Sequence, residues 1–162
     1  KWRKLWNRTS GGCYRKISIR KGIIMTVTFT EIDDSNIVIN ATIWEDSILG
    51  DPASEENGKN YLANFFSVPA DKFVQTFHDG IRKQLGGVTL TWDSANNVFI
   101  LPQPFTSWSL DASYDWQPPV ANPDTAGYDT IWNESALTWD GLKISDNSNW
   151  IWNTTTNEWD AV

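Results

Sequence analysis

The 162-residue chain contains one cysteine, one histidine and one methionine. A single cysteine excludes an internal disulfide and a zinc site built from several thiolates. The histidine, His78, precedes Asp79-Gly80, which is typical of a turn, so we expect no catalysis there. The sequence also lacks a glycine-rich phosphate loop, a nucleophile elbow and a cluster of metal ligands. It therefore predicts no enzyme, no cofactor and no metal.

Long apolar runs are missing as well. No run approaches the ~18 residues of a membrane helix, and no apolar segment of signal-peptide type follows the basic N-terminus. We therefore expect no membrane partner. Because the chain begins with Lys1, we expect further residues upstream. Alternatively, Met25 is the natural start and residues 1–24 are an over-extended reading of the gene.

The acidic side chains, 20 in number, single out no catalytic pair. So many carboxylates supply close pairs by chance, so a glycosidase pair is neither indicated nor excluded. The segments 93–97 and 146–149 carry side chains of the kind that bind calcium, but neither has the full EF-hand pattern. Solvated turns are the favoured interpretation of both segments.

Charge is distributed very unevenly along the chain. Residues 1–24 hold eight of the 13 Lys and Arg and no acid, whereas residues 25–162 hold the other five and all 20 acids, a net charge of −15. A basic arm on an acidic body can bind nucleic acid, an acidic neighbour, or the body of another copy. The acidic body disfavours packaged DNA, so we expect the arm to dock on protein. Its candidate anchor residues are Trp2, Arg3, Lys4, Trp6 and Arg8.

Hydrophobic alternation predicts a mainly β fold: short hairpins in a small sheet or sandwich, short helical turns, and extended N- and C-terminal segments. Strands are expected at 26–32, 37–44 and 73–77, and the clearest hairpin at 88–101, around the polar loop 93–97. Residues 45–58 are expected to form a loop, 61–66 either helical turns or a strand, and the proline-rich 102–124 an extended surface segment. The expected units are a basic arm (1–24), an acidic β-rich body (25–124) and a Trp-rich hairpin extension (125–162).

Tryptophan is unusually abundant, with 11 residues, and four of them form a weak repeat. Trp132 is followed seven positions later by Trp139, and Trp152 in the same way by Trp159. Two short hairpins would place each pair at cross-strand positions. Such hairpins are only marginally stable alone, so they need a neighbour to pack against. The four indoles are equally compatible with a subunit interface and a sugar-binding platform. Trp44 and Trp92 lie inside strand patterns and are expected in the core.

A longer pattern runs from Arg82 to Trp139, about 60 residues. It comprises Arg82-Lys83, Gly87, Thr91-Trp92-Asp93, Phe99-Ile100, Pro102-Gln103-Pro104-Phe105-Thr106-Ser107-Trp108-Ser109-Leu110, Trp116, Pro119-Val120, Pro123, and Trp132-Asn133-Glu134 to Trp139. The order resembles a small module of marine tailed phages, notably those of cyanobacteria. The chain departs from that pattern at Gln84-Leu85-Gly86, where the module has Asn-Tyr-Ala, and at Trp92, where it has Tyr.

This resemblance implies a virion protein and not an enzyme. We expect a structural or accessory component of a tailed bacteriophage, such as a head decoration, neck or tail component, that assembles with other virion proteins in multiple copies. The arm and the aromatic anchors would dock on neighbouring subunits. The alternatives are a carbohydrate-binding adhesion module of a tail or fibre, which would bind host surface glycan, and a virus-encoded chaperone for fibre assembly.

Overall fold

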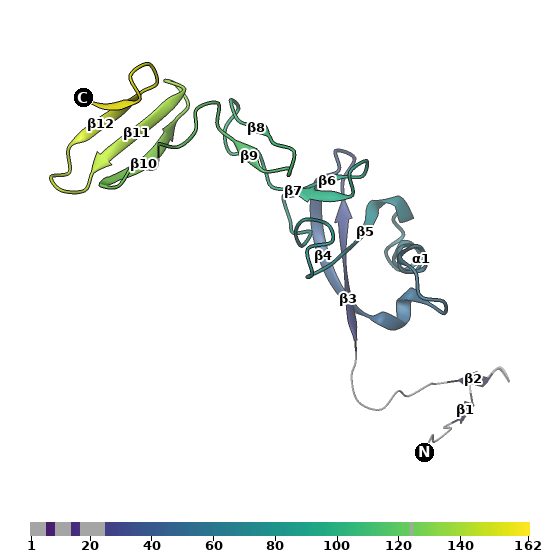
Figure 1. Ribbon diagram of the computed structural model, residues 1–162. Coiled ribbons are helices and arrows are strands. Elements are labelled where there is room, and N and C mark those ends of the chain that lie inside the picture. Colours follow the sequence, from purple (N-terminus) through teal and green to yellow (C-terminus); the bar gives the residue numbers. More distant parts are fainter. Residues whose placement is uncertain (1–5, 9–13, 17–24, 124) are drawn as a thin grey trace.

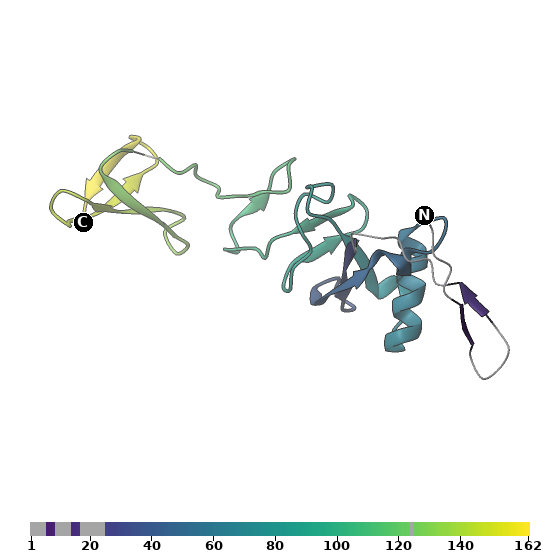
Figure 2. The same cartoon turned by 90° about the horizontal axis from the view of Figure 1, so that it is seen from below.

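The computed structural model describes residues 6–8, 14–16, 25–123 and 125–162. It confirms the mainly β fold: the described residues form small antiparallel sheets, one α-helix and two short 3₁₀ helices. The elements follow one another along an elongated molecule, with the helix-bearing body towards one end and the C-terminal sheet at the other (Figures 1 and 2).

The basic arm contributes two described strands. These are β1 (Trp6–Arg8) and β2 (Tyr14–Lys16), which pair antiparallel with each other. The other predicted anchors of the arm, Trp2, Arg3 and Lys4, lie outside the described residues. The role of the arm therefore stays a prediction.

The body is built on a three-stranded antiparallel sheet in the order β4-β3-β5. Its strands are β3 (Thr26–Ile32), β4 (Val38–Glu45) and β5 (Phe73–Thr76), which confirms the predicted hairpin and the third strand. The turn between β3 and β4 is held by Asp33, whose carboxylate accepts backbone N–H groups of Ser35 and Ile37. This local bonding is why the Asp/Asn-rich stretch turns where it does.

The prediction of a loop over 45–58 was wrong. A 3₁₀ helix, η1 (Asp46–Leu49), occupies part of it, and α1 (Glu55–Phe66) begins within it. Ser54 caps α1 by accepting the N–H of Asn57, and two acidic residues lie in the first turn, where the helix dipole favours them. Gly58 suggested a loop, but a Cβ there would collide with the Phe29 ring, so this glycine allows the helix to approach the sheet.

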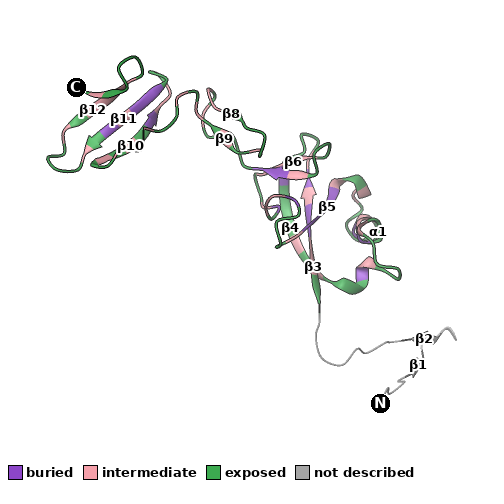
Figure 3. Ribbon diagram, in the orientation of Figure 1, coloured by how far each residue is buried: buried purple, intermediate pink, exposed green. Residues whose placement is uncertain are grey.

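Two clusters of buried side chains hold the body together, and Figure 3 colours the buried stretches of the ribbon purple. One lies between α1 and the sheet and contains Phe29, Ile48, Leu62 and Phe73, with Trp44 partly buried against it. The other contains Ile32, Val38, Val74, Trp92 and Phe99. Trp92 is therefore a core residue, as predicted. After α1, the chain returns to β5 through the 3₁₀ helix η2 (Ala70–Lys72).

The predicted hairpin at 88–101 is confirmed, with shorter strands than expected. Its strands are β6 (Thr91–Asp93) and β7 (Val98–Ile100). The proline-rich stretch that follows turns back on itself once, in a small hairpin of the two-residue strands β8 (Ser109–Leu110) and β9 (Trp116–Gln117). The Asp111 carboxylate closes this turn by accepting the N–H groups of Ser113 and Asp115.

The C-terminal residues form a four-stranded antiparallel sheet in sequence order. Its strands are β10 (Tyr128–Asn133), β11 (Thr138–Lys143), β12 (Asn149–Asn153) and β13 (Glu158–Ala161). Trp132 lies opposite Trp139, and Trp152 opposite Trp159, which confirms the predicted cross-strand pairs. The two hairpins stabilise each other by pairing β11 with β12.

Candidate functional site

The turns of the tryptophan hairpins share one hydrogen-bonding scheme. The side-chain oxygen of Asn133 accepts N–H groups two and three positions on, and its amide donates to Asp140 at 2.9 Å. Asn153 makes the same bonds, with Asp160 as the acceptor at 2.8 Å. The residue four positions on from each Asn, Leu137 or Asn157, has a left-handed backbone.

A third copy of this turn lies in the body, outside the two units of the tryptophan repeat. Asp93 accepts the N–H groups of Ala95 and Asn96, and Asn97 has the left-handed backbone. Trp92 lies opposite Phe99, seven positions later, as the Trp pairs do. The same seven-residue spacing of aromatic residues is present in the sequence. A pattern of Trp pairs does not include it, because Phe99 replaces the second Trp.

Pairing register divides the C-terminal sheet into two faces, since directly opposed residues share a face. The face that we call the aromatic face carries Tyr128, Trp132, Trp139, Lys143, Trp150, Trp152 and Trp159. The other, which we call the acidic face, carries Asp129, Ile131, Asn133, Asp140, Leu142, Asn149, Ile151, Asn153, Glu158 and Asp160.

The segment that leads into the sheet covers part of the aromatic face. The Trp108 ring contacts Trp132 and Trp139 at centroid distances of 6.2 and 6.5 Å. The Trp139 indole donates to the carbonyl of Val120 at 2.9 Å, and the Trp159 indole donates to the hydroxyl of Thr125. The part of the aromatic face around Trp132 and Trp139 is therefore occupied by the chain itself.

Glu134 joins the same segment to the sheet. Its carboxylate accepts hydrogen bonds from the hydroxyls of Thr106 and Ser107 at 2.6 and 2.7 Å, from the Ser107 N–H at 2.9 Å and from the Trp132 indole at 2.8 Å. These donors, the Thr106 hydroxyl foremost, lower the pKa of Glu134 to about 2. We call these residues, together with Trp108, the Glu134 clasp.

The clasp unites residues that the phage-like pattern singled out. Ser107, Trp108, Trp132 and Glu134 belong to two separate motifs of that pattern, and the structure brings them into contact across 27 sequence positions. Composition and periodicity gave no sign of this pairing. In chemical terms the clasp is a carboxylate with several hydrogen bonds beside indoles in edge-to-face and tilted contact. Such an arrangement holds the segment and the sheet in one relative orientation.

The four predicted C-terminal anchors differ in burial. Trp132 and Trp139 are 5% and 7% exposed, and the groups that cover them belong to this chain. Trp152 and Trp159 are half-buried, and Tyr128 stacks on Trp159 at 4.7 Å. Contact with a neighbour through any of the four stays a prediction.

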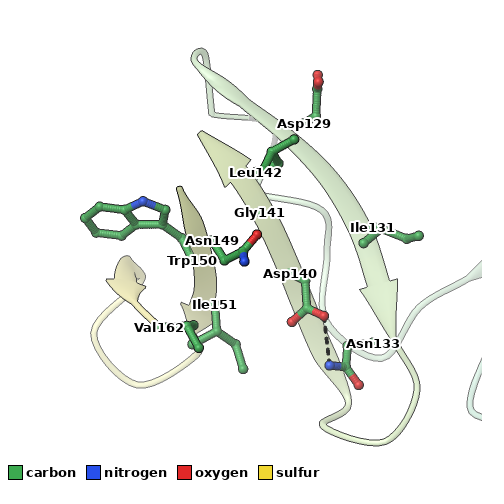
Figure 4. A pocket seen from close by; sticks show the side chains of 10 residues that line it. All are labelled: Asp129, Ile131, Asn133, Asp140, Gly141, Leu142, Asn149, Trp150, Ile151 and Val162. Atoms are coloured by element: carbon green, nitrogen blue, oxygen red, sulfur yellow. Dashed lines mark hydrogen bonds between the residues drawn. The ribbon is translucent and has the colours of Figure 1, made fainter. Parts of the chain in front are cut away.

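The acidic face of this sheet carries several exposed side chains. It forms a groove of about 550 Å³, and Figure 4 shows the side chains that line it. Within it Ile131 is 67% exposed and Val162 is 85% exposed. Lys143, the sole Lys or Arg of residues 125–162, lies on the aromatic face, with its ammonium 5.1 Å from the Trp150 ring centre. The acidic face thus carries four carboxylates and no cation.

The other predicted features are turns in the structure. His78-Asp79-Gly80 forms a turn after β5, and the carboxylates of Asp93 and Asp146 bond within their own turns. Across 25–123 and 125–162, no group of three or more His, Cys, Asp or Glu side chains is placed to hold a metal ion. In the described part of the chain, no helix has the length and apolarity that crossing a membrane requires.

Comparisons with protein-family models, with curated proteins and with solved structures find no match to this chain.

Proposed function

We propose that this chain is a non-enzymatic structural or accessory protein of a tailed-phage virion, such as a head decoration, neck or tail component. Its role is to join neighbouring subunits, which it contacts through the basic arm and through surfaces of its β modules. Other virion proteins are its partners.

The observation that carries this proposal is the Glu134 clasp. The residues shared with the phage-like pattern converge there, and the hydrogen bonds of Glu134 and the ring contacts of Trp108 are made within the chain. Such a clasp fixes the orientation of the C-terminal sheet relative to the segment before it. A subunit that must present surfaces to several neighbours needs this kind of rigidity, because a preorganised surface loses less entropy on binding.

Charge distribution supplies further support. Residues 1–24 carry eight cations, and the acidic face of the C-terminal sheet carries carboxylates beside exposed apolar side chains. Complementary charged surfaces on one chain favour association between copies or with similarly charged neighbours.

Quantitative mass spectrometry of gradient-purified virions of the phage that encodes this chain tests the proposal. We expect the chain at a fixed copy number per virion, in several copies, with a non-structural protein of the same phage as the depletion control. If the chain is made during infection and is absent from purified virions, the proposal is wrong, and the assembly-chaperone alternative replaces it.

The sugar-binding alternative now depends on the half-buried rings Trp150, Trp152 and Trp159, because Trp132 and Trp139 are covered within the chain. Virions carrying Trp152→Ala and Trp159→Ala separate the two functions. A structural role predicts weakened assembly whether or not glycan is present. Intact assembly with loss of binding to host surface polysaccharide would establish the adhesion function instead.

A further inference from the structure

We propose that the acidic face of the C-terminal sheet is the docking site for the basic arm, residues 1–24, of a second copy of the chain. The contact joins one end of a molecule to the opposite end of the next. This inference rests on the proposed assembly role and identifies the surface and the partner that carry it out.

The chemistry of the acidic face specifies its partner. Ile131 and Leu142 are exposed in the groove, and Val162 adds a third apolar side chain at its edge. Asp129 and Asp140 also line the groove, and Glu158 and Asp160 lie on the same face of the sheet. A partner that buries the apolar side chains must bring positive charge, because burying carboxylates without a counter-charge is costly.

A face-to-face dimer of this sheet does not meet that requirement. Two-fold packing would place the same four carboxylates of each copy against one another, and like charges across an interface cost several kcal/mol. The acidic face therefore favours a chemically different surface, and a basic segment with apolar side chains fits it.

In the described part of residues 25–162, every Lys and Arg already has an ion-pair partner. Residues 25–162 contain five Lys and Arg, and each of them forms an ion pair within the chain. The pairs are Lys59–Glu55, Lys72–Asp34, Arg82–Glu55, Lys83–Asp115 and Lys143–Asp146. All the other cations of the sequence belong to the arm, which also carries Trp2, Leu5 and Trp6 and has no acid. The arm thus matches the groove in both charge and apolar content.

The shape of the molecule indicates that the arm comes from another copy. The first strand after the arm, β3, belongs to the body towards one end of the molecule, and the acidic face lies on the C-terminal sheet at the other end (Figures 1 and 2). A contact between opposite ends of two identical chains is heterologous, so it propagates into rings or open chains. Multiple copies in one assembly follow directly from this geometry.

Complementary charge reversals in the full chain test the proposal. The arm-reversed variant carries Arg3→Glu, Lys4→Glu and Arg8→Glu, and the face-reversed variant carries Asp129→Lys and Glu158→Lys, two exposed residues. The matched control for the face-reversed variant is Glu45→Lys with Asp46→Lys, which makes the same charge change on exposed residues of the body. Molar mass is measured by light scattering after gel filtration, and near-ultraviolet circular dichroism confirms that each variant is folded.

We expect the mass of the wild-type chain to rise with concentration, and its association to weaken about tenfold or more between about 50 and about 500 mM NaCl. Each reversed variant alone should be monomeric. Mixed together, they should form a 1:1 dimer that grows no further, because one chain supplies the intact face and the other the intact arm. The control variant should associate like the wild type. Ile131→Ser with Leu142→Ser, which keeps every charge, should weaken association at least tenfold through the lost apolar contact.

Three results would overturn the inference: a wild-type chain that stays monomeric at every soluble concentration, a mixture of reversed variants that stays monomeric, or a control that weakens association as much as the face-reversed variant. The test uses the purified chain alone. A chain that is present in virions but monomeric in solution would refute this docking site and leave the proposed function intact. A chain that self-associates as expected but is absent from virions would refute the proposed function and leave the docking site intact.

Discussion

Arg82 carries its charge into the interior of the body. The side chain is 8% exposed, and its guanidinium donates to both carboxylate oxygens of Glu55, at 3.1 and 2.7 Å, and to the carbonyl of Gln75. It also lies over the rings of Phe77 and Trp92. Burial acts to raise the pKa of Glu55, but the bonds from Arg82 and the Gln75 N–H outweigh it and lower that pKa. One ion pair therefore ties α1, β5 and the β6–β7 hairpin together.

Replacing Glu55 by Ala should lower the free energy of unfolding by about 3 kcal/mol, because it leaves a buried guanidinium without its counter-charge. Urea denaturation followed by circular dichroism measures the loss. Glu56→Ala is the matched control, since Glu56 is the next residue of the same helix turn and is exposed, and it should change stability by no more than about 0.5 kcal/mol. Equal effects of the two substitutions would show that the ion pair adds no stability.

The pKa of Glu134 leads to a prediction about acid. The folded-state pKa is about 2, below the ordinary value of 4.5. The clasp therefore contributes its full stabilisation above about pH 4.5 and loses it as the pH falls towards 2. We expect the difference in Tm between the wild-type chain and Glu134→Gln to be largest near neutral pH and to shrink across this range. Subtracting the variant cancels the other carboxylates, so a difference independent of pH would contradict the ionised clasp.

The three Asx-type hairpins show how a single local unit is reused along the chain. In each, an Asp or Asn side chain satisfies two backbone N–H groups, and one residue takes a left-handed backbone. That residue is Asn97 or Asn157 in two copies and Leu137 in the third. Asn tolerates this conformation better than Leu, because its short polar side chain bonds locally. The Leu137 turn is therefore the least favourable of the three.

Leu137→Asn should stabilise the protein by about 0.5–1 kcal/mol, because it relieves the left-handed strain and Leu137 is exposed, so little burial is lost. The reciprocal change, Asn157→Leu, should destabilise the protein by a similar amount. Paired denaturation curves measure both. A loss of stability in Leu137→Asn would mean that the leucine side chain contributes more than its backbone conformation costs.

The described modules have distinct cores, and side-chain contacts link them. The body has two buried clusters, and the C-terminal sheet has its own cluster of indoles. The intervening segment is tied to the body by the Lys83–Asp115 ion pair and by the Trp116 indole, which donates to the carbonyl of Leu101. The Glu134 clasp ties it to the sheet. These contacts link the body and the C-terminal sheet, which lie at different ends of the elongated molecule (Figures 1 and 2).

Removing residues 1–24 should leave a folded chain that fails to join its assembly. The buried clusters of the body and the C-terminal module lie entirely within residues 25–162, so the denaturation midpoint should change little. Association should be lost, and the loss of the Trp anchors should account for most of this effect. Exposed ion pairs contribute only ~0–1 kcal/mol each to binding. Thermal melts together with light scattering check both parts. An unfolded product would show that the arm belongs to the core.

Features that depend on neighbours a few residues apart could be predicted from the sequence. The 26–32 strand, the hairpin within 88–101 and the Trp pairs follow from two-residue alternation and from Asx turns, whose hydrogen bonds close locally. The basic arm and acidic body follow from counting charges. The contact between copies of the chain stays a prediction, from the sequence and from the structure alike.

Tertiary contacts decided the remaining features. The helix includes Gly58 because a residue without a Cβ fits there against Phe29, 29 positions earlier, and no local pattern reveals this contact. The partnership of Ser107 with Glu134 and that of Glu55 with Arg82 each span 27 positions. Which face of the C-terminal sheet is covered depends on the path of the segment before it. Packing and charge pairing act between residues that are close in space, and the folded chain alone determines which residues those are.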